Sequence, residues 1–509
     1  MKKLIYLFCI LLFSGCDHFL KEYSQDLVVA QHVSDLDEIL LGSCYIPSVQ
    51  YTDINVTGDY CSWLNFLDDD VNTVIGGGSA RTTGPSYNLF GYTTWQLEVG
   101  RDIEGRNLLS DDFTWNNLYY RINVANIILD EANGMKADGE ADQLALERIK
   151  GECHFLRAQF YLVLVNLYAN AYVPGEAANT LGVPLKLTSY VEHDKDKNVQ
   201  FDRVSVAAVY DQIVSDLKEA VDYLTKSPQP KPLHRVSREA AVLLLSRTYL
   251  YMQDWINARV TAREFLESNR VLQDMNTFSE ETVFLEEKSQ ELVFSQGGLN
   301  VHTTLTGETG RLCVTRDLYD LYDEDNDYRA MLWFSPRYYT DSMALTGKYR
   351  LGAHRSQISD CFMLRNAEGY LNIAEACAML DEAEANDWLN ELRRFRIKNY
   401  TDQHYAGEEL IRQVREERRK ELCFEGHRWF DLRRYAVTVK MPFKKEIRRV
   451  FAYYNMEIRN EFDYAEVFVL EKDDPAYTFR IPVSVLKRDE GMLDNPRRKR
   501  EVLEVIRNN

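Results

Sequence analysis

Helical periodicity is the feature that most restricts how this chain can fold. In one segment the apolar residues recur at steps of three and four: Trp115, Leu118, Ile122, Ala125 and Leu129. This spacing places the side chains on one face of an α-helix. The segment from Val206 to Leu224 repeats the spacing, and Ser205 before it is a suitable N-cap. A longer helix is expected from Ile149 to Tyr168. The pattern predicts amphipathic helices that pack on one another.

Two further stretches predict helix pairs. In residues 237–266, Ser237 opens a helix, a tight turn follows, and Ala258 and Ala262 give the next helix a small-residue face. The segment from Tyr249 to Leu266 resembles a tetratricopeptide unit, and the segment from Tyr370 to Leu392 resembles a second one. Because isolated repeats bury too little surface, we expect further pairs from residues 115–225 to complete the stack. The fold class predicted is all-α, a scaffold of tetratricopeptide-like helix pairs with long irregular loops and a few short strands.

Two regions break the helical pattern. Residues 68–110 contain seven glycines among scattered aromatic residues, including Gly76, Gly77, Gly78, Gly84 and Gly91. Residues 270–365 are rich in Gly, Thr and Asp and suit loops and short strands. A short helix starting at Ser34 precedes both regions. Long loops on a rigid scaffold often carry binding residues, so both regions are candidates for ligand contact.

The N-terminus predicts export and lipid attachment. Lys2 and Lys3 precede an apolar run that ends in Leu-Phe-Ser-Gly-Cys at Cys16. The run is short for a membrane span, and its ending resembles the box that directs lipid transfer to cysteine before cleavage. We therefore expect residues 1–15 to be a signal peptide and Cys16 to carry the lipid anchor. Residues 16–509 are expected to form a single domain, with an N-terminal part at about 16–230 and a C-terminal part at about 231–509.

Charge and cysteine usage exclude several classes of protein. The 509 residues carry a formal net charge of -19, which disfavours nucleic acid as a partner. Of nine cysteines, Cys9 lies in the expected signal peptide and Cys16 would carry lipid, which leaves seven, and none has metal-ligand spacing. Cys153, Cys377 and Cys423 lie in helical apolar patterns and are expected to be buried thiols. A disulfide scaffold and a metal site are both disfavoured.

Catalytic motifs are missing, with one alternative left open. The sequence contains no GxSxG, HExxH or phosphate-loop spacing. Asp323, Asp325 and Asp327 imitate a calcium loop, but Tyr328 stands where glycine is required, so a turn before a helix at Arg329 is favoured. The adjacent acids Asp68, Asp69 and Asp70 could serve a secreted helical glycoside hydrolase, although such runs more often form polar turns.

The segment from Ile411 to Arg434 carries a family resemblance. It reads IRQVREERRKELCFEGHRWFDLRR, and further ordered blocks lie at residues 115–126, 151–167, 203–217 and 368–395. Together with the lipidation box, these blocks resemble the SusD/RagB family. Asp494 departs from the family's closing segment, which usually has glutamine. Glu417, Glu421 and Glu425 are four residues apart, and we expect them to form an ion-pair network rather than a catalytic site.

The resemblance implies a function as well as a fold. A member of this family would be a non-enzymatic outer-membrane lipoprotein that faces the exterior and captures glycan. It would pass the oligosaccharide to a TonB-dependent, SusC-like transporter, without a cofactor or a metal. The secreted glycoside hydrolase is the alternative, and a purely structural surface protein is a third class.

No ligand residue follows from the family motifs, so the candidates come from composition. Sugar rings stack on exposed aromatic rings, and the irregular region offers Trp95 first, with Tyr92 and Arg101 beside it. Trp63 and Trp333 are secondary candidates. The competing interpretation is that these rings pin their loops to the scaffold, since large aromatic residues are usually buried. In that case the loops between residues 295 and 340 would be the next candidates.

Overall fold

A computed structural model describes most of the chain. The described residues are 30–47, 61, 63–75, 85–108, 110–190, 201–228, 233–299, 301, 305, 312–336, 342–349, 357–455 and 461–507. Within them one continuous hydrophobic core runs from Val33 to Met492. The predicted signal peptide and Cys16 lie outside the described residues, as do Gly76, Gly77, Gly78 and Gly84.

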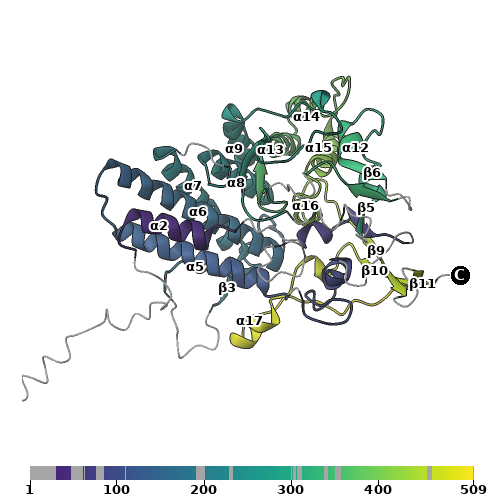
Figure 1. Ribbon diagram of the computed structural model, residues 1–509, viewed down its shortest axis with the longest axis horizontal. Coiled ribbons are helices and arrows are strands. Elements are labelled where there is room, and N and C mark those ends of the chain that lie inside the picture. Colours follow the sequence, from purple (N-terminus) through teal and green to yellow (C-terminus); the bar gives the residue numbers. More distant parts are fainter. Residues whose placement is uncertain are drawn as a thin grey trace, which may run out of the picture.

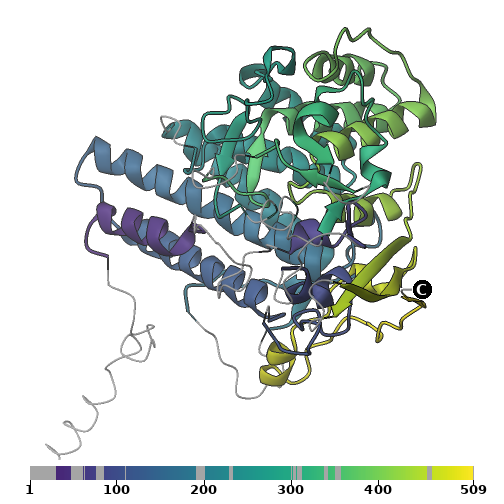
Figure 2. The ribbon, with the colours of Figure 1, turned by 45° about the vertical axis from the view of Figure 1, so that its right-hand side comes forward.

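Helices form the main body of the molecule (Figure 1). The N-terminal half contains α2 (Val33–Ile39), α3 (Pro85–Asn88), α4 (Phe90–Thr93), α5 (Phe113–Gly134), α6 (Glu140–Tyr168), α7 (Val206–Lys226), α8 (Arg238–Tyr251) and α9 (Trp255–Ser268). The C-terminal half contains α11 (Arg316–Tyr319), α12 (Tyr328–Trp333), α13 (Asn366–Met379), α14 (Ala385–Arg394), α15 (Gly407–Glu421), α16 (Arg428–Ala436) and α17 (Val483–Arg488). The longest described helices, α5, α6 and α7, lie side by side at one end of the molecule (Figure 2).

The helices pack in a continuous series. Helix α5 contacts α6, α6 contacts α7, and the series continues through α8 and α9 to α13, which also contacts α14 and α15. Glycines permit two of these close approaches, because a Cβ at Gly151 would lie 2.8 Å from Leu224 Cγ and a Cβ at Gly369 would lie 2.6 Å from Phe265 Cδ1. The predicted stack of helix pairs is therefore confirmed, with α8–α9 and α13–α14 as the two hairpins read from the sequence.

The strands form small sheets, and the two larger sheets lie at the end of the molecule opposite the long helices (Figure 1). A four-stranded sheet has the order β1 (Val71–Thr73), β5 (Leu312–Val314), β7 (Met343–Leu345) and β6 (Phe334–Pro336). Another sheet has the order β11 (Glu504–Arg507), β10 (Glu461–Leu470) and β9 (Ile447–Asn455). The pairs β2 (Leu181–Pro184) with β3 (Arg203–Ser205) and β4 (Leu292–Ser295) with β8 (Met363–Arg365) are two-stranded. All the pairings are antiparallel.

Helix caps follow the sequence in most places and depart from it in one. Ser205 and Ser237 accept hydrogen bonds from the backbone N–H groups of Ala208 and Ala240, as predicted. Ser34 is not a cap, because α2 begins one residue earlier and its N-cap is His32. There the carboxylate of Asp35 accepts a hydrogen bond from the His32 backbone N–H. The prediction of a helix was right and its first residue was wrong.

Candidate functional site

The aromatic residues predicted as a ligand platform are packed into the core. Trp63 and Tyr92 are 1% and 2% exposed, and their rings stack at 4.5 Å with an interplanar angle of 13°. Phe479, from a segment far along the chain, packs against Trp63 at 5.1 Å. These three rings fasten the irregular region to the C-terminal segment. The expected exposure of Trp63 and Tyr92 is not found, and their assignment to ligand binding stays a prediction.

Trp95 and Trp333 are also fully buried. The indole N–H of Trp95 donates to the Leu67 carbonyl at 2.9 Å, and the Arg449 guanidinium lies 5.4 Å from its ring centre. The Lys348 amine lies 4.4 Å from the centre of the Trp333 ring. Both rings thus pin their loops, which is the competing interpretation of the sequence. Their assignment to ligand binding stays a prediction, and burial is unfavourable to it.

Arg101 is the exposed member of the predicted set. It forms an ion pair with Glu98 three residues earlier, and its guanidinium also donates to the Gly105 carbonyl at 2.6 Å. Because Trp95 and Tyr92 point into the core, the structure does not bring Arg101 together with an exposed ring. The predicted constellation is not assembled at this surface.

The three adjacent acids Asp68, Asp69 and Asp70 are buried among cations. Arg428 donates to both oxygens of Asp69 at 2.7 and 2.8 Å, and Arg419 contacts Asp70 at 2.7 Å. Burial and the neighbouring carboxylates raise the pKa of Asp68, whereas at Asp69 burial is outweighed by Arg419 and Arg428, which lower its pKa. The cluster joins β1 to the C-terminal helices. This position suits a structural ion cluster, and nothing in its geometry favours the glycoside hydrolase.

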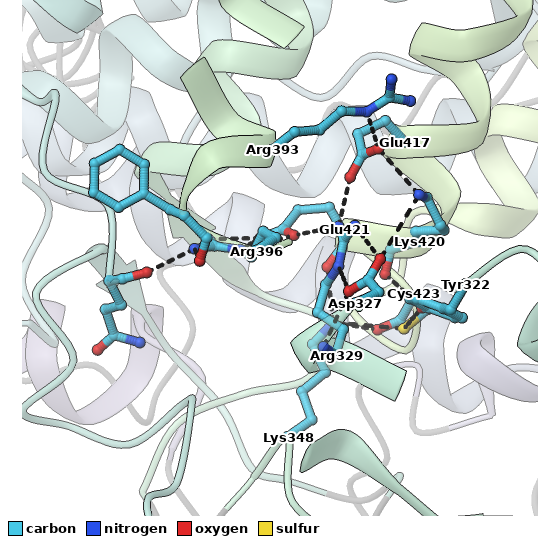
Figure 3. A network of polar contacts seen from close by, with 12 residues as sticks. Tyr322, Asp327, Arg329, Lys348, Arg393, Arg396, Glu417, Lys420, Glu421 and Cys423 are labelled. Carbon is cyan, nitrogen blue, oxygen red and sulfur yellow. Dashed lines mark hydrogen bonds and ion pairs between the residues drawn. The ribbon is translucent and has the colours of Figure 1, made fainter. Parts of the chain in front are cut away.

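Glu417 and Glu421 lie at the centre of a larger buried network (Figure 3). Arg329, Arg365 and Arg396 each donate to the Glu421 carboxylate, at 2.8, 2.8 and 2.9 Å. Arg393 donates to Glu417 at 2.6 Å. Burial opposes ionisation of Glu421, but Arg396, Arg365 and Arg329 lower its pKa well below the usual range. The predicted ion-pair network is confirmed.

Two details of that network differ from the sequence interpretation. Its cations come largely from other elements rather than from the same helix. Glu425 is not on the helical face, because α15 ends at Glu421 and Phe424 adopts a φ of 60°. Glu425 instead receives two hydrogen bonds from Arg365 at 2.8 and 2.9 Å.

The Asp-rich turn before α12 is a helix cap. The Asp327 carboxylate accepts from the Arg329 backbone N–H at 3.0 Å and pairs with the Arg329 guanidinium at 2.8 Å. Asp323 accepts hydrogen bonds from the backbone N–H groups of Asp325 and Asn326. The carboxylates of Asp323 and Asp327 therefore make the contacts expected of a turn that caps a helix, as the turn interpretation predicts.

The cysteines behave as small buried side chains. Cys153, Cys377 and Cys423 are buried, as the sequence predicts. Cys377 lies near Glu382 and Glu384 in an arrangement that could hold a metal ion. Two arginines already occupy these acids, since Arg259 pairs with Glu382 and Arg263 with Glu384. This arrangement fits a structural cluster better than a metal site.

An open cleft that sequence reasoning missed lies on the long helices. Its volume is about 320 Å³, and it is lined by Asn126, Leu129, Asp130, Asn133, Lys150, His154, Arg157, Leu187, Thr188, Ser189, Tyr190 and Tyr223. Apart from Leu129, the lining residues of α5 and α6 are polar and follow steps of three and four, with Asn126, Asp130 and Asn133 on α5 and Lys150, His154 and Arg157 on α6. Because only the apolar face was used to define these helices, the matching polar stripes were not recognised. A search for polar stripes on adjacent helices would have found the cleft.

The walls of the cleft are held by a second layer of hydrogen bonds. Arg157 donates to the Asn126 side-chain oxygen at 2.7 Å and to the Asp216 carboxylate at 2.9 Å. Asn126 in turn donates to the Lys186 carbonyl at 2.9 Å, and the Lys186 amine donates to the carbonyls of Thr188 and Tyr190. The segment 187–190, which lines one side of the cleft, is therefore held against α5 and α6 by these hydrogen bonds.

None of the helices within the described ranges is both long enough and apolar enough to cross a membrane.

Comparison with known proteins identifies two family matches in chain order. Residues 97–250 match a profile of SusD-like proteins described as starch-binding and associating with the outer membrane, and residues 339–497 match the SusD family profile. A SusD-like protein of Formosa agariphila is 26% identical over 258 residues, which are 50% of this chain. The chain spans only 43% of that relative's length.

Solved structures share the fold over nearly the whole chain. A SusD superfamily protein of Bacteroides thetaiotaomicron superposes with a TM-score of 0.69 at 21% identity, covering 92% of this chain and 100% of the other. A SusD-like carbohydrate binding protein of Bacteroides vulgatus gives 0.67 at 22% identity, covering 91% and 97%. At these identities the likeness concerns the fold. The two profile matches, which together cover more than half of the chain, show that the chain belongs to the SusD/RagB family.

Proposed function

We propose that this protein is a cell-surface lipoprotein that binds glycan and delivers oligosaccharide to a TonB-dependent, SusC-like transporter in the outer membrane. The observation that carries the proposal is the pair of SusD profile matches in chain order, one of them described as starch-binding and associated with the outer membrane. The likeness to a carbohydrate binding protein of Bacteroides vulgatus supports the same ligand class.

A non-catalytic role fits the chemistry of the described acids. Asp69 is engaged by Arg428, and Glu421 is engaged by three arginines. A glycosidase needs a carboxylic acid and a carboxylate that face a sugar bond across a cleft. Acids neutralised inside the protein cannot take those positions without breaking their ion pairs. We therefore propose that the chain binds its ligand without cleaving it.

The proposed anchor is tested by fractionation. Cys16→Ala should release the protein from the outer membrane, because its thiol is the one that follows the short apolar segment and the small residues. Cys9→Ala, within the same segment, is the matched control and should remain membrane-bound. Retention of Cys16→Ala in the outer membrane at the level of the unaltered protein would show that the anchor is misassigned.

The proposed partner and ligand are tested together. After gentle detergent extraction, the protein should co-purify with a TonB-dependent transporter, and the isolated protein should bind polysaccharide without shortening it. Product formation would be followed by chromatography of the glycan. Recovery of shortened glycan, with no transporter in the complex, would favour the glycoside hydrolase instead.

A further inference from the structure

The cleft on α5, α6 and α7 has the properties of a binding site that the proposed function does not yet use. Its volume of about 320 Å³ falls in the range of small-molecule sites. Its second layer of hydrogen bonds, from Arg157 through Asn126 to Lys186, holds the walls in place before any ligand arrives. Preformed walls reduce the entropy cost of binding.

The cleft combines aromatic rings with polar groups that make no hydrogen bond within the described residues. Tyr190 is 44% exposed, and Tyr223 is partly exposed with its ring stacked on His154. Within the described residues, the Lys150 amine lies 6.0 Å from the centre of the Tyr223 ring, and neither this amine nor the Asn133 side-chain amide makes a hydrogen bond or an ion pair; both residues belong to the lining. Rings beside unoccupied donors and acceptors suit a ligand with apolar CH faces and many hydroxyl groups.

The charges of the cleft are balanced. Asp216 neutralises Arg157 from behind and contacts His154 Nδ1 at 2.8 Å. Asp130 contributes a carboxylate to the same lining as the Lys150 amine. An anion-binding site would need a surplus of cations, and a cation-binding site a surplus of carboxylates. The balance therefore favours an uncharged ligand over an acidic or a basic one.

We propose that this cleft binds a short stretch of uncharged oligosaccharide, with Tyr190 and Tyr223 stacking on sugar rings and with Lys150 and Asn133 hydrogen-bonding to hydroxyl groups. The inference rests on the proposed glycan-binding function, because it specifies where and in which charge state the glycan is held. The Ser189 hydroxyl, which donates to Asp130 at 2.7 Å, keeps that carboxylate oriented within the lining.

Calorimetric titration of the full chain tests the proposal. The protein would be kept in a detergent without a sugar head group and titrated with maltohexaose, cellohexaose, xylohexaose, mannohexaose and, as an acidic probe, tetragalacturonate. For the neutral oligosaccharide that binds most tightly, Tyr190→Ala and Tyr223→Ala should each weaken binding about tenfold, as expected for loss of one stacking ring.

Two further variants complete the design. Asn133→Trp places a bulky side chain at an exposed lining position and should obstruct the cleft, which keeps the test decisive if Tyr223→Ala fails to fold. Tyr120→Ala is the matched control, because Tyr120 is a 55% exposed tyrosine of α5 outside the lining, and its affinity should be unchanged. Thermal unfolding would confirm that each variant is folded.

The outcomes separate the two proposals. Unchanged affinity for a neutral oligosaccharide in Tyr190→Ala, Tyr223→Ala and Asn133→Trp overturns the cleft and leaves the glycan-binding function standing. Absence of binding to all the oligosaccharides overturns the glycan-binding function and the cleft with it. Tighter binding of tetragalacturonate that is lost in the same variants overturns the assignment of an uncharged ligand.

Discussion

Arginines rather than apolar side chains fill much of the space around Glu421. Arg329, Arg365 and Arg396 are at most 1% exposed, and each donates to this one carboxylate. A buried ion pair contributes little net stability, but loss of one partner removes a counter-charge from the buried charges that remain. The Glu421 carboxylate therefore links several segments that are distant in the chain.

We expect Glu421→Gln to lower the free energy of unfolding by about 3 to 5 kcal/mol, because it leaves three buried guanidinium groups around a neutral amide. Urea denaturation followed by tryptophan fluorescence measures the change. Glu416→Gln on the same helix is the control, since Glu416 forms a solvent-exposed pair with Arg412. Its effect should stay below about 1 kcal/mol. Equal losses in the two variants would contradict the role assigned to the network.

His427 gives the stability a predicted dependence on pH. Burial, and then the positive charges of Arg247 and Arg418, lower its pKa well below the ordinary 6.5. Below pH 6.5 the unfolded chain binds a proton here that the folded chain does not, so the free energy of unfolding falls as the pH is lowered from 7 to 5. One proton gives a slope of up to about 1.4 kcal/mol per pH unit.

Denaturation curves at pH 5, 6 and 7 check this prediction. His427→Gln keeps a side-chain acceptor for Arg418 and should flatten the slope in this range. Below about pH 4.5, Glu421 and Glu425 should lower the stability further, both in the unaltered protein and in His427→Gln. Their pKa values are lowered in the folded protein, so the unfolded chain binds protons at these carboxylates while the folded chain does not. Parallel slopes from pH 5 to 7 would rule out His427 as their source.

At the scale of elements, glycines decide how closely the helices approach. Gly369 of α13 leaves no room for a Cβ beside the buried Phe265 ring of α9. Gly369→Ala should therefore lower the free energy of unfolding by about 1 to 3 kcal/mol through overpacking. Gly134→Ala is the control, because a Cβ at this end of α5 meets nothing within 4 Å. It should change stability by less than about 1 kcal/mol. Thermal and urea unfolding compare the two, and equal stability would mean that α9 and α13 can separate freely.

Local spacing predicted the helices because each apolar face is encoded by residues three and four apart. The same spacing predicted a helix pair, because Ala258 and Ala262 are four residues apart and give one helix face small side chains. The pairing of β9 with β10 was not predicted from the sequence, because it depends on contacts between whole strands. The burial of Trp63 also escaped, because its partner Phe479 lies hundreds of residues away in the chain. The cleft required knowing that the polar faces of α5 and α6 stand side by side.

At the scale of the whole molecule, the two parts expected at about residues 16–230 and 231–509 share one core. Arg433 donates to the carbonyls of Asn166 and Ala169, and Arg449 donates to the carbonyls of Phe66 and Asp68. Buried guanidinium groups of the second part thus complete the backbone hydrogen bonding of the first.

Expressed separately, neither part should fold, because each would expose core surface and leave these groups unsatisfied. Circular dichroism and thermal unfolding should show no cooperative transition for either fragment and a single transition for the intact chain. Co-expression of the two fragments is the control and should restore a folded complex. A cooperative transition in one isolated fragment would contradict the shared core.

The position of Glu421 in the chain also sets the order in which the fold can be completed. Glu291, Arg329 and Arg365 are all synthesised before it, and they share one buried network with it. Before Glu421 is synthesised, Arg329 and Arg365 have only part of their final set of carboxylate partners, namely Asp327 and Glu291. Because burial of an incompletely neutralised charge is costly, we expect this part of the core to close only after the segment around Glu421 has been synthesised.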